Sequence, residues 1–90
     1  MKKVYLGIIG DGYYLNLKGE RDSINDVVLC KTLNEILDRL SGGGGYIQKH
    51  RKLELVYDKE INKGDINSIK QNATKKGIKL EKVAIDKRYL

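Results

Sequence analysis

Hydrophobic and polar residues alternate in two short runs near the start of the chain. Residues 4–9 and 13–17 each show the period of two that β-strands require, and Gly10-Asp11-Gly12 separates the two runs. Asp11-Gly12 is typical of a two-residue type I′ turn, in which both central residues need positive φ angles. The pattern therefore predicts a β-hairpin.

A helical period follows the hairpin. After a polar stretch, apolar residues recur at spacings of three and four as far as Leu40, as in an amphipathic helix. Ser23 and Asp26 resemble a capping pair at its start, and Glu35 and Arg39 form an expected exposed i,i+4 pair. We therefore predict one helix from Ser23 to near Leu40. Its expected apolar face consists of Ile24, Val27, Val28, Leu33, Ile36, Leu37 and Leu40.

Four consecutive glycines, Gly42–Gly45, come directly after this helical pattern. Each glycine costs a helix roughly 1 kcal/mol relative to alanine, so the helix is expected to end there. In a P-loop, a glycine-rich run binds phosphate and is followed by a helix that begins with Lys and Ser or Thr. Here the glycines are followed by Tyr46 and a basic run, so the sequence does not predict a P-loop. We interpret residues 41–45 as a flexible Gly-rich connector within one domain, residues 1–90.

The second half of the chain predicts one strand, one helix and a further strand. Alternation marks residues 53–57 and 80–85 as strands. Asp65 is the expected N-cap of the helix between them, and Gly77 is the expected left-handed residue at its end. The predicted order is ββαβαβ. It implies an α+β two-layer sandwich, a four-stranded mixed sheet with two helices on one face.

Charge divides the chain into two unlike halves. Residues 1–45 hold six basic and six acidic side chains, whereas residues 46–90 hold twelve and six, so the whole net charge of +6 falls in the second half. This asymmetry indicates an acidic partner such as nucleic acid, although a lysine-rich surface also serves solubility alone. The residues of the predicted basic binding patch are Lys49, His50, Arg51, Lys52, Lys75, Lys76 and Lys79.

Residues suited to catalysis or metal binding do not form a recognisable motif. His50 is the only histidine and lies among cations, where no neighbouring carboxylate orients it. Cys30 is the only cysteine, so no disulfide within the chain is expected, and its expected role is that of a small buried residue in the first helix. We predict no catalytic residues, no metal and no cofactor, and therefore no enzymatic activity.

Two segments carry a likeness to a known family. Residues 9–16 contain a Gly turn followed by aromatic residues, Leu and Asn. Residues 53–65 contain a strand, an Asp-Lys turn and a helix entry. Both segments resemble the soluble periplasmic domain of the ExbD/TolR biopolymer-transport family. The closing residues 73–78 and 83–85 are similar to that domain as well. Lys63 stands where the family usually has Tyr, and the family's transmembrane helix with its proton-path aspartate has no counterpart here. The resemblance implies self-association and partner contacts, and no ion-channel chemistry.

The leading functional expectation is a non-enzymatic protein–protein interaction module. We expect a homodimer or a protein partner at a sheet edge, where β-augmentation adds a strand. The alternative is a small basic nucleic-acid-binding protein that uses the second half of the chain. The apolar runs are too short to span a membrane. The expected location is cytoplasmic, or periplasmic if the chain is an excised domain of an inner-membrane protein.

Overall fold

Five strands form a single mixed sheet. The computed structural model describes residues 1–21 and 26–89. The strand order is β3-β2-β1-β4-β5; β2 is antiparallel to both of its neighbours, whereas β4 is parallel to both β1 and β5. The α+β fold and the mixed sheet are confirmed, but the predicted count of four strands and the predicted order ββαβαβ are wrong, since three strands precede the first helix and the observed order is βββαβαβ. The strands are β1 (Lys2–Ile9), β2 (Gly12–Asn16), β3 (Val27–Cys30), β4 (Leu53–Tyr57) and β5 (Leu80–Ile85).

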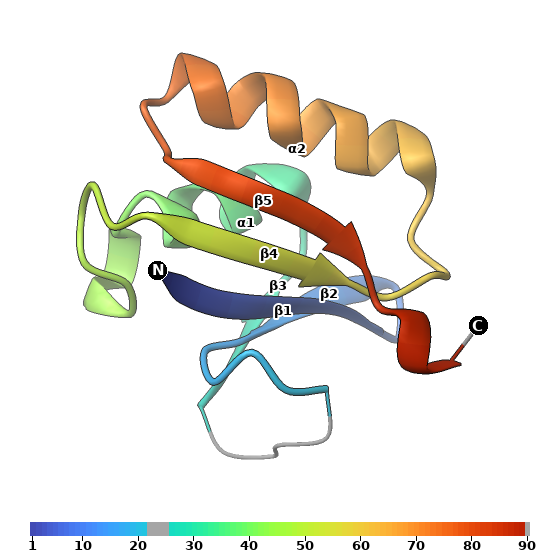
Figure 1. Cartoon of the computed structure of the whole chain (residues 1–90). Helices are drawn as coiled ribbons and strands as arrows, with labels where there is room; N and C mark the ends of the chain where they lie inside the picture. The colour runs from blue at the N-terminus through green and yellow to red at the C-terminus, as the bar shows by residue number, and fades with distance from the viewer. Residues whose placement is uncertain (22–25, 90) are drawn as a thin grey trace.

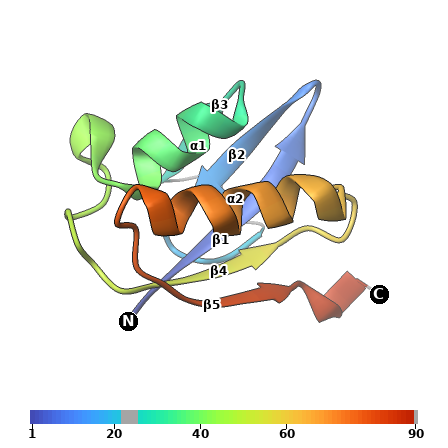
Figure 2. The ribbon, with the colours of Figure 1, turned by 90° about the horizontal axis from the view of Figure 1, so that it is seen from above.

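Two α-helices cover one face of this sheet. Helix α2 (Lys63–Lys75) lies above the strands in Figure 1, where α1 (Leu33–Leu40) is seen behind β5, and Figure 2 shows the two helices side by side over that face. Two short 3-10 segments are η1 (Gly43–Gly45) and η2 (Lys87–Tyr89). Among the described residues, no α-helix covers the opposite face, which we call the open face. No helix in this part of the chain is long and apolar enough to cross a membrane.

The fifth strand, β3, replaces the first half of the helix predicted from Ser23. Ser23 lies outside the described residues, and Asp26 has a φ of 64°, which no right-handed helix accepts. Val28 and Cys30 are buried while Leu29 is 64% exposed, so the segment alternates as a strand does. β-branched Val27 and Val28 favour that conformation.

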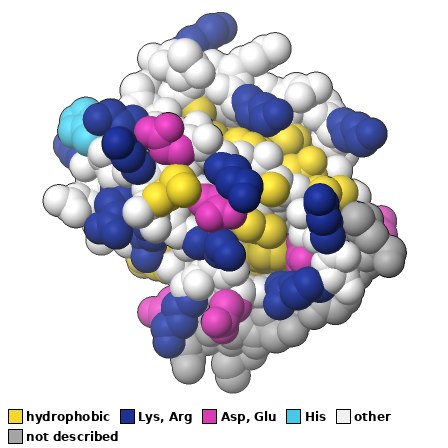
Figure 3. Space-filling model, in the orientation of Figure 1, with side chains coloured by type: hydrophobic (Ala, Val, Ile, Leu, Met, Phe, Trp, Pro, Cys, Tyr) yellow, Lys and Arg dark blue, Asp and Glu magenta, His cyan; other side chains and the backbone are white. Residues whose placement is uncertain are grey.

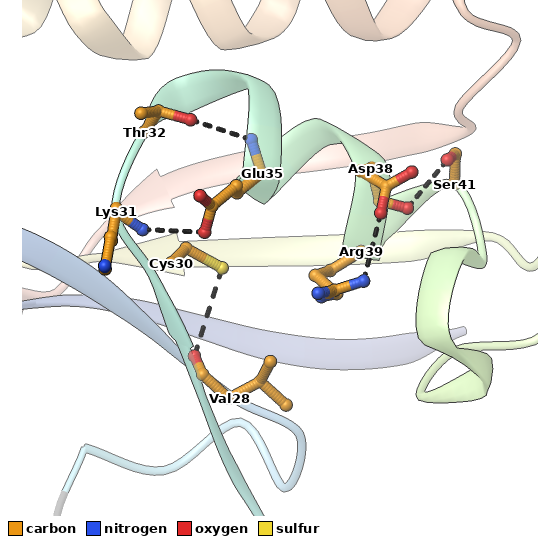
Figure 4. Close-up of polar contacts among 8 residues, drawn as sticks. All are labelled: Val28, Cys30, Lys31, Thr32, Glu35, Asp38, Arg39 and Ser41. Carbon is orange, nitrogen blue, oxygen red and sulfur yellow. Dashed lines mark hydrogen bonds and ion pairs between the residues drawn. The ribbon is translucent and has the colours of Figure 1, made fainter.

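Helix α1 begins only after Thr32. The Thr32 side chain accepts a hydrogen bond of 3.2 Å from the Glu35 backbone N–H, and the Glu35 carboxylate accepts one of 2.9 Å from the Lys31 N–H (Figure 4). This pair takes the place of the predicted cap at Ser23. The predicted pairing of Glu35 with Arg39 is wrong, since Arg39 bonds to Asp38 instead at 3.0 Å (Figure 4).

The predicted hairpin is confirmed, but its turn differs by one residue. Ile9 pairs with Gly12, so the two turn residues are Gly10 and Asp11. Gly10 has a φ of 56°, whereas Asp11 and Gly12 are not in the positive-φ region. A positive φ at the first position alone is the pattern of a type II′ turn, which favours glycine there. The predicted type I′ turn at Asp11-Gly12 is therefore wrong.

Helix α2 starts earlier than predicted and ends as predicted. Asn62 is its N-cap and accepts a hydrogen bond of 2.6 Å from the Gly64 N–H, so the predicted cap at Asp65 is wrong. Asp65 lies in the first helical turn, where the helix dipole favours a carboxylate. Gly77 has a φ of 72° and directs the chain towards β5, which confirms its left-handed role.

The glycine-rich connector forms a turn that packs on the end of α1. Gly42, Gly44 and Gly45 have positive φ angles, and the Gly45 N–H donates to the Gly42 carbonyl at 3.1 Å. A side chain at Gly43 would collide with the carboxylate of Asp38. Glycine is therefore favoured at Gly42, Gly44 and Gly45 by the backbone conformation.

Candidate interaction surfaces

The fold brings the two halves of the predicted basic patch together. Lys49, His50, Arg51 and Lys52 precede β4, while Lys75, Lys76 and Lys79 lie between the last turn of α2 and β5. Strands β4 and β5 are parallel neighbours, and the Leu53 N–H donates to the Lys79 carbonyl at 2.8 Å. Both segments therefore lie at the end of the sheet where the parallel strands begin, which we call the basic end.

Every side chain of the predicted patch is exposed at the basic end. Figure 3 shows Lys and Arg side chains gathered at this end, at the left of the view. Lys2 joins them, because its N–H donates to the Lys52 carbonyl at 2.9 Å. None of the four ion pairs found among the described residues involves one of the seven predicted residues. Their charges are thus left unneutralised by the rest of the described chain.

The glycine-rich connector helps to position this basic run. Ile47 is buried and anchors the segment, whereas Tyr46 stays half exposed beneath the Arg39 guanidinium, which lies 5.6 Å from its ring centre. The stem of Lys49 packs so closely on Gly42 that a β-carbon there would approach its Cγ to 2.7 Å. Tyr46 precedes Lys49, the first cation of the basic run, by three residues.

Strand β5 forms one free edge of the sheet. Figure 2 shows it at the margin, outside α2. The Asp86 N–H donates inward to the Tyr57 carbonyl at 2.8 Å. Because successive N–H groups alternate between the two sides of a strand, those of Val83 and Ile85 point outward. The edge therefore presents backbone donors and acceptors for which the described chain shows no partner.

A groove with an apolar floor and polar rims runs along β5 beside α2. Its volume is about 300 Å³, and Figure 3 shows hydrophobic side chains gathered between Lys and Arg side chains in this region. Lys82 is 62% exposed and lies 3.8 Å from the carboxylate of Glu54. The lining residues are Lys70, Ala73, Thr74, Ile78, Leu80, Glu81, Lys82 and Val83.

Two tyrosines cover the middle of the open face. The Tyr14 ring lies so close over Gly7 that any side chain there would collide with it, and its centre is 6.3 Å from that of Tyr5. Tyr5 is 1% exposed, and its hydroxyl has no hydrogen-bond partner of ordinary geometry among the described residues. Burial, and then the nearby Asp86 carboxylate, raise the pKa of Tyr5.

Asp86 sits at the edge of a cavity on this same face. Arg88 donates to its carboxylate from Nε at 3.2 Å and from Nη2 at 3.3 Å, and these bonds lower the pKa of Asp86 despite its burial. The cavity has a volume of about 520 Å³ and a floor that includes Val56 and Ala84. Its cations are partly matched by carboxylates, namely those of Glu20, Glu54 and Asp86.

The side chains with catalytic potential lie apart from one another. Cys30 belongs to β3, not to the first helix, so its predicted location is wrong although its burial is as predicted. Its thiol lies 4.0 Å from the Val28 carbonyl (Figure 4), and burial is the main cause of its raised pKa. His50 lies in the exposed loop before β4. The described residues contain no group of three or more His, Cys, Asp or Glu side chains placed to hold a metal.

Sequence reasoning located the basic residues but missed the groove and the buried tyrosine of the open face. The groove depends on how α2 lies across β5, and the alternation of residues 80–85 was the only feature of the sequence that pointed to it.

Comparison with known proteins adds no assignment: no family model matches, and neither the curated proteins nor the solved structures yield a match. Nothing found there links the chain to ExbD/TolR, which stays a prediction.

Proposed function

We propose that this protein is a non-enzymatic interaction module that binds another polypeptide through the β5 edge, and that a second copy of the chain is its simplest partner. The observation that carries the proposal is the free six-residue edge of β5. Exposed edges template the addition of a strand. The half-buried side chains of Val83, Ala84 and Ile85 add apolar surface next to this backbone.

A two-fold dimer follows naturally from this edge. Two copies of β5 running antiparallel place the same residues on both sides of the symmetry axis, and such an isologous contact closes on itself. The second edge of the sheet, β3, has only four residues and therefore offers fewer backbone pairs. Extending the sheet through β5 gives the larger contact.

Sedimentation velocity of three proteins tests the proposal. Ile85→Pro removes an outward N–H without removing a bond to β4, and proline is tolerated at such edge positions. Ile85→Ala keeps that N–H and serves as the matched control for the lost side chain. We expect wild type and Ile85→Ala to dimerise and Ile85→Pro to remain monomeric. A wild-type protein that stays monomeric up to roughly millimolar concentration contradicts self-association, because about 4 kcal/mol is then the most the contact supplies.

Nucleic-acid binding at the basic end is the second candidate. The observation that favours it is the meeting of seven exposed basic residues that have no ion-pair partner among the described side chains. Phosphate contacts need mobile cations more than fixed geometry. Tyr46, half exposed next to the run, adds a surface on which a base can stack.

Fluorescence anisotropy with a labelled oligonucleotide tests this second candidate. Binding driven by phosphates weakens by orders of magnitude between about 50 and about 200 mM salt. We expect the triple variant Lys49→Gln, Arg51→Gln and Lys52→Gln to lose the binding. A variant with Lys59→Gln, Lys63→Gln and Lys87→Gln removes the same charge from the opposite end of the sheet and is the control. Equal losses in both variants, or no binding at low salt, reject a site at the basic end.

A further inference from the structure

We infer that the groove between α2 and β5 binds an extended acidic segment of a partner protein, which pairs with β5 and places every second side chain in the groove. The inference rests on the β5 edge of the proposed function and names a partner class for it. It is carried by three features that lie together, namely a free strand edge, an apolar floor and flanking lysines.

The backbone of β5 supplies the first of these features. The outward N–H and C=O groups of Val83 and Ile85 match the spacing of an added strand. Side chains of an extended peptide point alternately to its two sides. Those on the helix side therefore face α2, and the others face away from it. Main-chain pairing gives affinity in this mode of recognition, whereas pockets for alternate side chains give specificity.

The floor of the groove selects apolar side chains. Ala73 and Ile78 are buried, and Leu80 and Val83 are half buried but in contact with the core. A volume of about 300 Å³ is at the small end for ligand pockets, which suits one or two aliphatic side chains. A phosphate backbone gains nothing from such a floor, so the groove favours a peptide over nucleic acid.

The charges beside the groove favour an acidic peptide. Lys70 and the carboxylate of Glu81 line it, whereas the ammonium of Lys82, which also lines it, pairs with Glu54 at 3.8 Å. At the beginning of β5 the groove leads into the basic end, where Lys75, Lys76 and Lys79 are exposed. Glutamate or aspartate side chains on the peptide's outer side meet these cations. Complementary charge of this kind raises the rate of encounter and fixes the register.

Fluorescence anisotropy with synthetic peptides tests the inference. The probe is a labelled eight-residue peptide in which valine and glutamate alternate. The first control has the same composition but places four valines before four glutamates, and the second has lysine in place of glutamate. We expect the alternating acidic peptide to bind at least about tenfold more tightly than either control, because only it has both the alternation and the charge.

Two substitutions on α2 then locate the bound peptide. Thr74→Tyr places a large side chain in the groove, whereas Gln71→Tyr makes the same change at an exposed position outside its lining. We expect Thr74→Tyr to weaken binding about tenfold or more and Gln71→Tyr to leave it unchanged. Equal affinity of both variants, or equal affinity for all three peptides, overturns the inference.

The outcomes separate this inference from the proposed function. Peptide binding is measured at low protein concentration, and self-association is followed separately by sedimentation. If wild type dimerises but no peptide binds, the groove inference fails while the edge proposal stands. If the alternating peptide binds a monomeric protein and Ile85→Pro abolishes that binding, the groove inference stands and the second copy is rejected as partner.

Discussion

The hydroxyl of Tyr13 donates a hydrogen bond of 3.0 Å to Oδ2 of Asp65, joining β2 to the first turn of α2 across 52 residues of chain. The bond is partly buried, and it connects the two halves of the protein near the end of the sheet where β1 and β4 finish. Burial is the main cause of the raised pKa of Tyr13, because a buried phenolate loses its hydration. The Asp65 carboxylate raises the pKa further, because it accepts the phenol's hydrogen bond and repels a phenolate.

Replacing Tyr13 with Phe is expected to lower the free energy of unfolding by about 1 kcal/mol, the usual contribution of one such hydrogen bond. The measurement is urea unfolding at neutral pH. Tyr46→Phe removes a hydroxyl from a half-exposed ring and is the control, for which we expect no change. Equal effects of the two substitutions contradict a structural role of the bond to Asp65.

Removing the Tyr5 hydroxyl is expected to have the opposite effect on stability from removing that of Tyr13. Tyr5→Phe is expected to leave the free energy of unfolding at pH 7 unchanged or higher, because a buried hydroxyl with no partner of ordinary geometry among the described residues loses its bonds to water on folding. The raised pKa gives a second test. The contribution of Tyr5 to the free energy of unfolding is fully present below its ordinary pKa of 10.0. It falls as the pH rises above that value, because the Tyr5 hydroxyl then ionises in the unfolded chain but not in the folded protein.

Urea unfolding at pH 7 and at about pH 10.5 compares wild type with Tyr5→Phe under these conditions. Wild type is expected to lose more stability between the two pH values than the variant does. A Tyr5→Phe protein that is less stable than wild type by more than about 1 kcal/mol at pH 7 contradicts this expectation and indicates that the hydroxyl is bonded, for example to the nearby Asp86 carboxylate.

The helix predicted from Ser23 shows why one element was misread. Ile24, Val27 and Val28 continue the spacing of Leu33, Ile36 and Leu37, so the period alone cannot separate a strand that runs into a helix from one longer helix. The turn at Lys31 and Thr32 has no glycine or proline to mark it. The capping pair of Thr32 and Glu35 was present in the sequence and was the available signal for the true helix start.

Removing that cap is expected to destabilise the protein. Thr32→Ala deletes the acceptor for the Glu35 N–H and is expected to lower the free energy of unfolding by about 1 kcal/mol, as at other N-caps. Thr32→Ser retains the hydroxyl and is expected to keep most of the stability. The measurement is thermal or urea unfolding followed by circular dichroism, and an alanine variant as stable as the serine variant would show that the cap contributes little.

The Asp86–Arg88 pair predicts an acid-sensitive contribution to stability. Hydrogen bonds from Arg88 hold the pKa of Asp86 below its ordinary value of 3.8. The stability from this group is therefore present above pH 3.8 and is lost as pH falls through the lower folded pKa. Asp86→Asn is expected to lower the free energy of unfolding at pH 7 by about 1 kcal/mol.

Unfolding measured from pH 7 down to about pH 2 tests this dependence. The Asn variant is expected to show a smaller loss of stability on acidification than wild type. Glu81→Gln removes an exposed carboxylate that has no ion pair among the described side chains, and it is the control. If the wild-type and Asp86→Asn curves run parallel, the pair does not stabilise the fold.

The candidate surfaces were foreseen only where they follow from composition. Lys49 to Lys52 form a run in the sequence, but their meeting with Lys75, Lys76 and Lys79 depends on β4 and β5 being parallel neighbours. Likewise, the sequence pattern around Leu80 and Val83 predicts only a strand and gives no sign of a groove. Only the position of α2 over the sheet leaves a groove beside them, and helix placement is a property of tertiary packing.

The central position of β1 has a consequence for the order in which a nascent chain folds. The segment β1-β2-β3 pairs locally, but the other side of β1 waits for β4, whose pairing begins with Leu53 against Lys2. During synthesis on the ribosome, β1 therefore has an open side until β4 has emerged from the exit tunnel. Such unpaired edges invite aggregation.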